Sequence, residues 1–244
     1  MKRVLLFISI ILALTACHQP GKVVAKSGQI HLIDSTLDAI QDSAYITKLA
    51  PIKAELEKKI GVVIGYAPEN LGVYQPECPM LNWATDALWE MAKQYYPEKV
   101  DIAVVNIGSM RCNWGKGDIT IKHVLELMPF DNELVVLTLS GKDLLELCDV
   151  FLVTGGEGIA GMQITAKNGV VTQALIAGQV IQPEQYYTIA TSDYLSQGND
   201  RMIPLKNSIK TWKSEKTIRD LYLEYIQQTK IVQAKVDGRF VIEK

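Results

Sequence analysis

The chain has 244 residues, of which 48% are hydrophobic and 21% charged, with a formal net charge of −2. These proportions exclude collagen-like, coiled-coil and wholly disordered proteins. The near balance of basic and acidic residues lacks the positive field of a DNA or RNA binder, so no nucleic acid polymer is expected as a partner. The length fits one large domain or two small ones.

The first residues have the parts of an export signal. Lys2 and Arg3 supply positive charge, and the apolar stretch from Val4 to Leu14 is too short to span a bilayer as a mature helix. Leu14-Thr15-Ala16-Cys17 resembles the bacterial lipoprotein signal, which implies cleavage before Cys17 and lipid attachment there. We therefore expect a signal peptide at residues 1–16 and an exported protein, lipid-anchored to a bacterial cell membrane on the periplasmic or outer-surface side. The alternative is an ordinary secretory signal with an incidental cysteine.

The segment after Cys17 predicts a tether followed by one folded domain. Residues 17–30 are polar and lack a clear period, as a tether between lipid and domain should. Residues 31–244 are expected to form a single domain without repeats. Cys78, Cys112 and Cys148 lack Cys-x-x-Cys spacing, so a zinc ribbon is not indicated, although any pair could bridge in an oxidising compartment.

Hydrophobic spacing places helices and strands in an uneven mixture along the chain. Helices are predicted over 35–60 with Pro51 as a break or new start, 80–95, 121–128 with Thr120 as cap, 142–152 and 215–229. Strands are predicted over 60–66, 101–106, 134–139, 162–166, 169–176, 186–191 and near Phe240, with a hairpin turn at Asn168-Gly169. This mixture predicts the α/β or mixed α+β class.

Several motifs with known chemistry fail in their context. Gly156-Glu-Gly158-Ile-Ala-Gly161 matches the dinucleotide-binding pattern, but here a helix is expected to enter and a strand to leave, the reverse of what pyrophosphate binding needs. Of the histidines, His18 and His31 lie beside or in the tether, and His123 on an amphipathic helix suits a structural role. A Cys112 nucleophile served by His123 lacks any feature that brings the two together. No catalytic residue is therefore assigned in this chain.

A set of polar and aromatic residues follows apolar strands or helix ends, where ligand sites of α/β folds form. Asn106 and Arg111 flank a glycine-containing loop after the strand at 101–106, and Phe130 follows a helix exit. Tyr194 and Asp200 follow the strand at 186–191. Taken singly, each has an ordinary alternative as a core, cap or solvent-facing residue.

In their order these elements resemble the C-terminal domain of the 5′-nucleotidase family. The motifs that carry the resemblance are Asn106-Ile-Gly-Ser-Met-Arg111, Gly117-Asp-Ile-Thr120, Met128-Pro-Phe130, Leu139-Ser-Gly141 and Tyr194-Leu-Ser-Gln-Gly198-Asn-Asp200, with Asn82 and Asp86-Ala87 on a helix before them. The resemblance implies a single mixed-sheet domain that recognises a nucleoside or nucleoside monophosphate.

The resemblance also implies a role for each matched residue. Phe130 and Tyr194 would stack on the two faces of a base, and Asp200 would accept the paired ribose hydroxyls. Asn106 would bind the base edge or sugar, and Arg111 would suit phosphate. Gly156 is a further substrate-binding candidate, through its backbone.

Two departures from the family pattern bear on function. The segment Gln75-Pro76-Glu77-Cys78-Pro79 has no basic residue where a further phosphate-binding Arg is common, and the usual Gly-Gly-Asp-Gly turn reads Gly198-Asn199-Asp200-Arg201. The family's two-metal site is built from Asp, His and Asn ligands, and it lies on a separate N-terminal domain of the family's enzymes. No metal cofactor is therefore expected on this chain, and divalent metals are expected on a partner chain.

These observations predict the recognition domain of a split 5′-nucleotidase that hydrolyses phosphomonoesters only with a separate metallophosphoesterase chain. One alternative is a non-catalytic nucleoside-binding lipoprotein for capture or uptake. Another is a structural lipoprotein with a degenerate pocket. The sequence leaves open the preferred base, whether phosphate is bound and whether the partner association is stable.

Overall fold

The computed structural model describes residues 25, 27–28, 30, 32–39 and 42–243. The expected signal peptide, Cys17 and much of the expected tether lie outside the described residues, as do His18 and His31. The chain divides into two compact units, one ending at Ala50 and the other comprising Pro51–Lys244.

Helix α2 (Ser43–Ile60) differs from the helix expected over residues 35–60. A separate 3₁₀ helix, η1 (Ser35–Ala39), precedes it, and Pro51 lies inside α2 and does not break it. A proline inside a helix removes one backbone hydrogen bond and its ring crowds the preceding turn, so Pro51 costs α2 stability although the helix continues through it. No residue of α2 is buried. In the part of the chain that the structure describes, no helix has the length and apolarity needed to cross a membrane.

The second unit is a mixed α/β fold, as predicted. Its helices are α3 (Pro79–Tyr95), α4 (Ile121–Leu127), α5 (Gly141–Thr154), α6 (Asp193–Ser196) and α7 (Ile218–Thr229), with the 3₁₀ helices η2 (Ile107–Ser109), η3 (Asn199–Arg201) and η4 (Ile203–Asn207). Its strands are β1 (Val63–Ala67), β2 (Ile102–Val105), β3 (Gly117–Thr120), β4 (Glu133–Ser140), β5 (Gly158–Ala160), β6 (Met162–Lys167), β7 (Val170–Ile176), β8 (Gln179–Val180), β9 (Tyr186–Ser192), β10 (Lys210–Thr217) and β11 (Phe240–Glu243).

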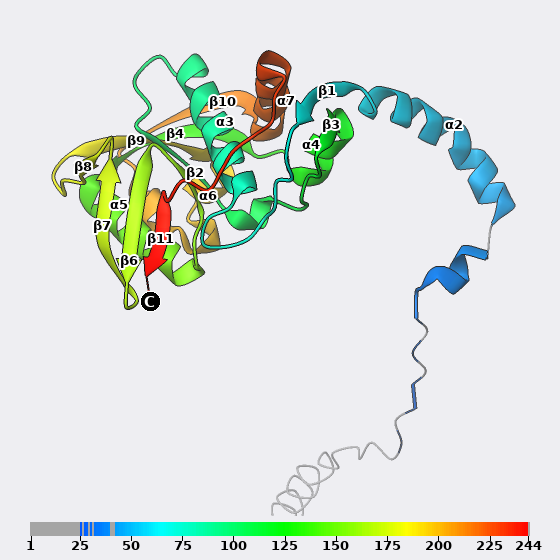
Figure 1. The fold of residues 1–244 in the computed structure, drawn as a ribbon, viewed down its shortest axis with the longest axis horizontal. Coiled ribbons are helices and arrows are strands. Elements are labelled where there is room, and N and C mark those ends of the chain that lie inside the picture. Colours follow the sequence, from blue (N-terminus) through cyan, green and yellow to red (C-terminus); the bar gives the residue numbers. More distant parts are fainter. Residues whose placement is uncertain (1–24, 26, 29, 31, 40–41, 244) are drawn as a thin grey trace, which may run out of the picture. The chain divides into compact units, whose positions relative to one another are not determined.

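The centre of this unit is a five-stranded sheet of order β10-β4-β9-β2-β5 (Figure 1). Strands β2 and β9 run parallel, and the other neighbours in this sheet run antiparallel. Alternate residues point to opposite faces of a strand, so Ala103 and Val105 join one core with α3, α4 and α7, whereas Ile102 and Val104 join a second core with α5 and strands β6 and β7. The sheet is therefore buried on both faces.

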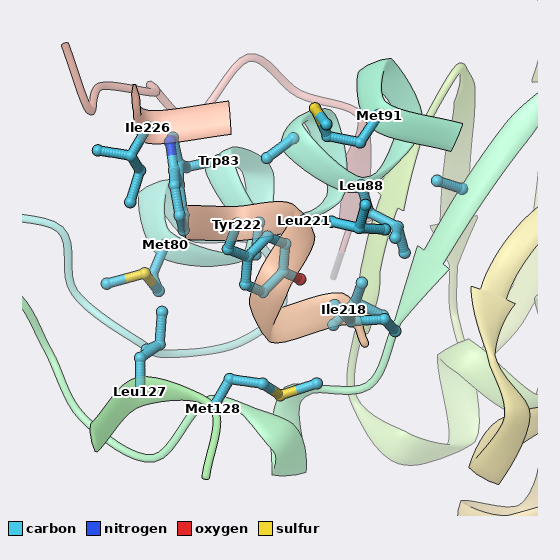
Figure 2. Packing of buried hydrophobic residues seen from close by; sticks show 14 of the residues in the cluster. Met80, Trp83, Leu88, Met91, Leu127, Met128, Ile218, Leu221, Tyr222 and Ile226 are labelled. Carbon is cyan, nitrogen blue, oxygen red and sulfur yellow. The ribbon is translucent and has the colours of Figure 1, made fainter. Parts of the chain in front are cut away.

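The first core fixes the segments that lead into the candidate site. Trp83 of α3 packs against Tyr222 of α7 with ring centroids 5.3 Å apart. Figure 2 shows Leu127 and Met128, at the end of α4, facing these two helices. Both side chains are buried, so the chain that continues to Phe130 leaves the core from a defined point.

Several elements differ from the sequence expectations. Strands β3, β5, β8 and β10 and the short helix α6 were not predicted, and α7 begins at Ile218 because residues 210–217 belong to β10. Strand β10 is an edge strand whose burial alternates, but its inward positions after Trp212 are the polar residues Ser214 and Lys216, so the sequence shows no apolar period there. The predicted hairpin turn is confirmed, with Asn168 and Gly169 both at positive φ between β6 and β7.

Candidate functional site

Strand register brings four chain segments to one edge of the central sheet. The parallel pairing of Ala103 with Ala190 sends the carboxyl ends of β2 and β9 in the same direction. The antiparallel pairing of Leu134 with Ser192 places the start of β4 at the end of β9. The antiparallel pairing of Val105 with Gly158 likewise places the start of β5 at the end of β2. The residues beyond these four strand ends are therefore neighbours.

Five of the six candidate binding residues line one cavity at this edge. The cavity has a volume of about 310 Å³, which is at the small end of the range for small-molecule sites. Its lining residues are Asn106, Gly108, Ser109, Arg111, Phe130, Asn132, Tyr194 and Asp200. Asn106 is buried and Phe130 half-buried, whereas Tyr194 is 39% exposed. The aromatic residues thus have ring surface within reach of a ligand.

Asp200 connects the two sides of the cavity. Asn106 Nδ2 donates a hydrogen bond to Asp200 Oδ2 at 2.5 Å, and the Tyr194 hydroxyl donates one to Asp200 Oδ1 at 3.0 Å. The hydrogen bond and the charge of Asp200 raise the pKa of Tyr194. Asp200 itself is exposed, so its carboxylate is accessible to ligand hydroxyl groups.

The turn that carries Asp200 has unusual backbone geometry. Gly198, Asp200 and Arg201 have φ values of +79°, +52° and +67°. The left-handed region suits glycine and is costly for other L-residues. At the position where the family pattern has its last glycine, Arg201 therefore bears the conformational cost of the left-handed region.

Phe130 is held from two directions. The Arg111 guanidinium carbon lies 5.0 Å from the centroid of the Phe130 ring. Arg219 Nη1, from the first turn of α7, donates to the Phe130 carbonyl at 3.2 Å, and its other terminal nitrogen pairs with Asp131. The cation over the ring is attracted by its π electrons. Arg111 is exposed. Among the described residues, it is the one cation that lines the cavity.

Gly156 lies outside the lining of the cavity. A Cβ atom on Gly156 would lie 2.2 Å from the Pro76 carbonyl oxygen, and the residue has φ +119°. Gln75 Nε2 donates to the Thr154 and Gly156 carbonyls at 2.7 and 2.9 Å. The structure therefore gives Gly156 a packing role, in which its lack of a side chain lets the Gln75-Pro76 segment approach.

Sequence reasoning missed several contributors to the site. Gly108, Ser109 and Asn132 line the cavity; the first two lie within the motif that contains Asn106, and Asn132 lies two residues after Phe130. Glu157 and Arg219 support the lining from outside it. A local motif could have indicated the first three, whereas Glu157 and Arg219 depend on strand register and helix packing.

Other family-motif residues serve the scaffold. Asn82 Nδ2 donates to Glu77 Oε1 at 2.6 Å, and Asp86 forms an ion pair with Arg239. His123 Nδ1 accepts the Thr120 amide at 2.9 Å where α4 begins, which agrees with the structural role expected for it. These contacts use the polar atoms for folding.

The described residues do not fit the two-metal site that the family resemblance implies. Among them, no group of three or more His, Cys, Asp or Glu side chains is arranged to hold a metal ion. Nor is Cys112 activated, because burial raises the pKa of its thiol. No chemical step is therefore assigned to this part of the chain.

A second, larger hollow is a weaker candidate for ligand binding. It measures about 460 Å³ and is lined by Asp86, Trp89, Asp237 and Arg239 among others. All three guanidinium nitrogens of Arg239 already donate to Asp86, Asp237 or the Ile159 carbonyl. Its strongest donors are thus occupied within the protein.

Comparison with known proteins decides the family. The model of the 5′-nucleotidase C-terminal domain matches residues 60–207, which is more than half of the chain. The chain belongs to this family. The matched region contains all five candidate residues that line the 310 Å³ cavity.

Relatives in this family are longer proteins. The Escherichia coli protein UshA is 26% identical over 76% of this chain and 34% of its own length. A Vibrio cholerae 5′-nucleotidase is 23% identical over 73% of this chain and 33% of its own length. The crystal structure of a 5′-nucleotidase precursor from Thermus thermophilus shares the fold with a TM-score of 0.73, at 22% identity, over 84% of this chain and 43% of that chain. The chain thus spans about a third of the length of these curated relatives.

Proposed function

We propose that the 310 Å³ cavity binds the nucleoside part of a nucleotide, and that the chain is the substrate-recognition part of a 5′-nucleotidase. The observation that carries this proposal is the meeting of Asn106, Arg111, Phe130, Tyr194 and Asp200 around one cavity. Such a set combines flat apolar surface with a few directed polar groups, as small-molecule sites do.

The two aromatic residues would hold the base. Stacking on an aromatic ring contributes about 1–3 kcal/mol per base and is tolerant of base identity, since every base has a π face. Phe130 is anchored through Arg219 and the end of α4, and Tyr194 through its bond to Asp200. The rings are thus positioned before the ligand arrives, which reduces the entropy lost on binding.

Asp200 and Asn106 would bind the sugar. Both oxygens of Asp200 accept hydrogen bonds from the protein, and each oxygen retains capacity for a further donor. A ribose offers two adjacent hydroxyl donors that match a carboxylate. Asn106 keeps its carboxamide oxygen available as an acceptor while its nitrogen donates to Asp200.

Catalysis would come from a second chain. We propose a separately encoded metallophosphoesterase that carries the divalent metals, which activate water and stabilise the transition state of phosphate ester hydrolysis. The match of this chain to the domain named as C-terminal in 5′-nucleotidases supports its part in such an enzyme. We further propose that Cys17 carries a lipid that holds the protein at the bacterial cell membrane after export.

Mixing the two chains tests this function. The partner to test is a secreted metallophosphoesterase of the same organism without a C-terminal domain of its own. Its hydrolysis of adenosine monophosphate is measured first without this chain and then with it. We expect phosphate release to rise when the chains are combined, and Phe130→Ala to reduce that rise. A rate no higher than that of the metal-bearing chain alone would end the split-enzyme proposal.

A second candidate function is capture of nucleosides without catalysis. One observation favours it: Arg111 is the single lining cation among the described residues, and its guanidinium already lies over Phe130. Calorimetric titration with adenosine and with adenosine monophosphate separates the two functions. Equal affinity would favour nucleoside capture, whereas tighter binding of the monophosphate would favour the nucleotidase.

A further inference from the structure

Glu157 is a buried carboxylate directly behind the cavity. The residue is 5% exposed, and its Oε2 accepts the Ile107 amide hydrogen at 2.7 Å. Burial raises the pKa of Glu157, the nearby charge of Asp200 raises it further, and the bond from Ile107 opposes the rise. A carboxylate is expensive to bury, so its retention beside a ligand cavity calls for an explanation.

The amide that Glu157 binds belongs to the loop that carries Asn106. Ile107 begins the 3₁₀ helix η2, and the Ser109 hydroxyl donates to the Asn106 carbonyl at 2.7 Å. On the cavity side, the Asn106 side chain donates to Asp200. Two carboxylates therefore hold this loop, Glu157 through the backbone and Asp200 through the Asn106 side chain.

The position of Glu157 follows from the fold. The pairing of Val105 with Gly158 sets the residue before β5 beside the residue after β2. Gly155 and Gly156, both at positive φ, shape the preceding turn, which Gln75 holds through the Gly156 carbonyl. The carboxylate is thus delivered to Ile107 by rigid elements, as a supporting residue of a binding site should be.

We infer that Glu157 is a positioning residue for ligand recognition, which aligns Asn106 and Asp200 for a ribose by fixing the Ile107 amide. This inference rests on the proposed function of the cavity. It assigns to Glu157 no contact with the ligand. Loss of the Glu157 carboxylate would leave the partly buried Ile107 amide without its acceptor and would release the loop that orients Asn106.

Glu77 offers a matched control in the same molecule. It is also buried, at 6% exposed, and its carboxylate accepts the amides of Asp237 and Gly238 at 2.8 and 3.1 Å. It does not line the cavity. A purely structural role for buried carboxylates predicts that Glu77 and Glu157 variants behave alike.

The test compares adenosine affinity by calorimetry, and thermal unfolding, for Glu157→Leu, Glu157→Gln, Glu77→Leu and Glu77→Gln. We expect Glu157→Leu to bind about 10-fold more weakly, and Glu157→Gln, which retains an acceptor oxygen, to restore affinity to within about 3-fold of wild type. We expect Glu77→Leu to unfold at a lower temperature while its affinity stays within about 2-fold. Should Glu157→Leu not fold, Glu157→Ala replaces it, because its smaller side chain admits a water molecule.

The outcomes separate this inference from the proposed function. Three results would overturn the positioning role and leave the nucleoside site standing. They are wild-type affinity in Glu157→Leu, equal losses of affinity in Glu157→Gln and Glu157→Leu, and a loss of affinity in Glu77→Leu equal to that in Glu157→Leu. A wild-type protein that fails to bind adenosine would overturn both.

Discussion

At the scale of single residues, the turn at Asp200 carries a cavity-lining side chain on a strained backbone. Asp200 and Arg201 both occupy the left-handed region, and only Asp200 has a role in the cavity that explains it. Strained residues persist where the surrounding structure determines them. The bond from Asn106 and that from Tyr194 fix Asp200 in this way, whereas Arg201 follows passively in the turn.

Replacement of Arg201 by glycine should stabilise the protein. Glycine adopts φ +67° without steric cost, and we expect a gain of about 1 kcal/mol, which raises the melting temperature by about 2–4 °C. Thermal unfolding measures the change. Lys235→Gly is the control, since the φ of Lys235 is not positive and the added flexibility should lower stability. An unchanged or lower melting temperature for Arg201→Gly would show that the turn carries no strain.

At the scale of elements, helices α3 and α7 contact each other through aromatic rings and polar groups, and the polar groups differ in whether they are hydrogen-bonded. The buried hydroxyl of Tyr222 has no hydrogen-bond partner among the described residues. The hydroxyl of Tyr95 donates to both oxygens of Glu224, at 2.8 and 2.7 Å. Two tyrosines at one helix pair therefore differ in what their hydroxyl groups contribute.

Tyr222→Phe should be neutral or stabilising by about 1 kcal/mol, because it removes a buried hydroxyl that has lost its bonds to water. Tyr95→Phe, the matched control, should destabilise, because it removes a satisfied bond to a carboxylate. Chemical denaturation of both variants measures the difference. A clear loss of stability in Tyr222→Phe would mean that its hydroxyl is satisfied in solution.

An interaction between the same two helices should make a small contribution to folding stability that depends on pH. Hydrogen bonds from Lys216 and Tyr95 lower the pKa of Glu224. A carboxyl group whose pKa is lower in the folded protein stabilises the fold at pH values above its pKa in the unfolded chain, which is about 4.3 for Glu. This contribution to stability is lost as the pH falls through the pKa of the folded protein. Glu224→Gln should therefore lose about 0.5–1 kcal/mol of stability at pH 7, and this deficit should shrink as the pH falls below about 4.3.

Denaturation curves of Glu224→Gln at several pH values test this dependence. Glu215→Gln, a change at an exposed position of β10, serves as the control and should follow the wild-type curve. A deficit of Glu224→Gln that does not shrink as the pH is lowered would show that the interaction does not depend on the carboxylate charge.

Element by element, what the sequence could predict depended on local signals. The lining residues Asn106, Phe130 and Tyr194 follow apolar segments within short motifs, so their place at element ends was readable. Strand β10 has one aromatic, Trp212, and otherwise polar residues, and even its buried position is a serine, Ser214, which hides its period. Glu157 and Arg219 act across 50 and 89 residues of sequence, through strand register and helix packing that no local pattern encodes.

At the scale of the whole molecule, the chain belongs to the 5′-nucleotidase C-terminal domain family and spans about a third of the length of its curated relatives. Family membership rests on residues 60–207, and the cavity lies within that range. The residues upstream contribute α2, which buries no side chain. What the whole chain does therefore depends first on whether the cavity holds a nucleoside.

Calorimetric titration of adenosine into the wild-type protein and into Phe130→Ala, Tyr194→Ala and Tyr194→Phe tests this claim most directly. Loss of one stacking surface, worth about 1–3 kcal/mol, should weaken binding by about 10-fold or more in each alanine variant. Tyr194→Phe keeps the ring and should bind within about 3-fold of wild type. Saturable binding with this pattern is the predicted result; no binding by the wild type, or equal affinity in the alanine variants, would contradict the account.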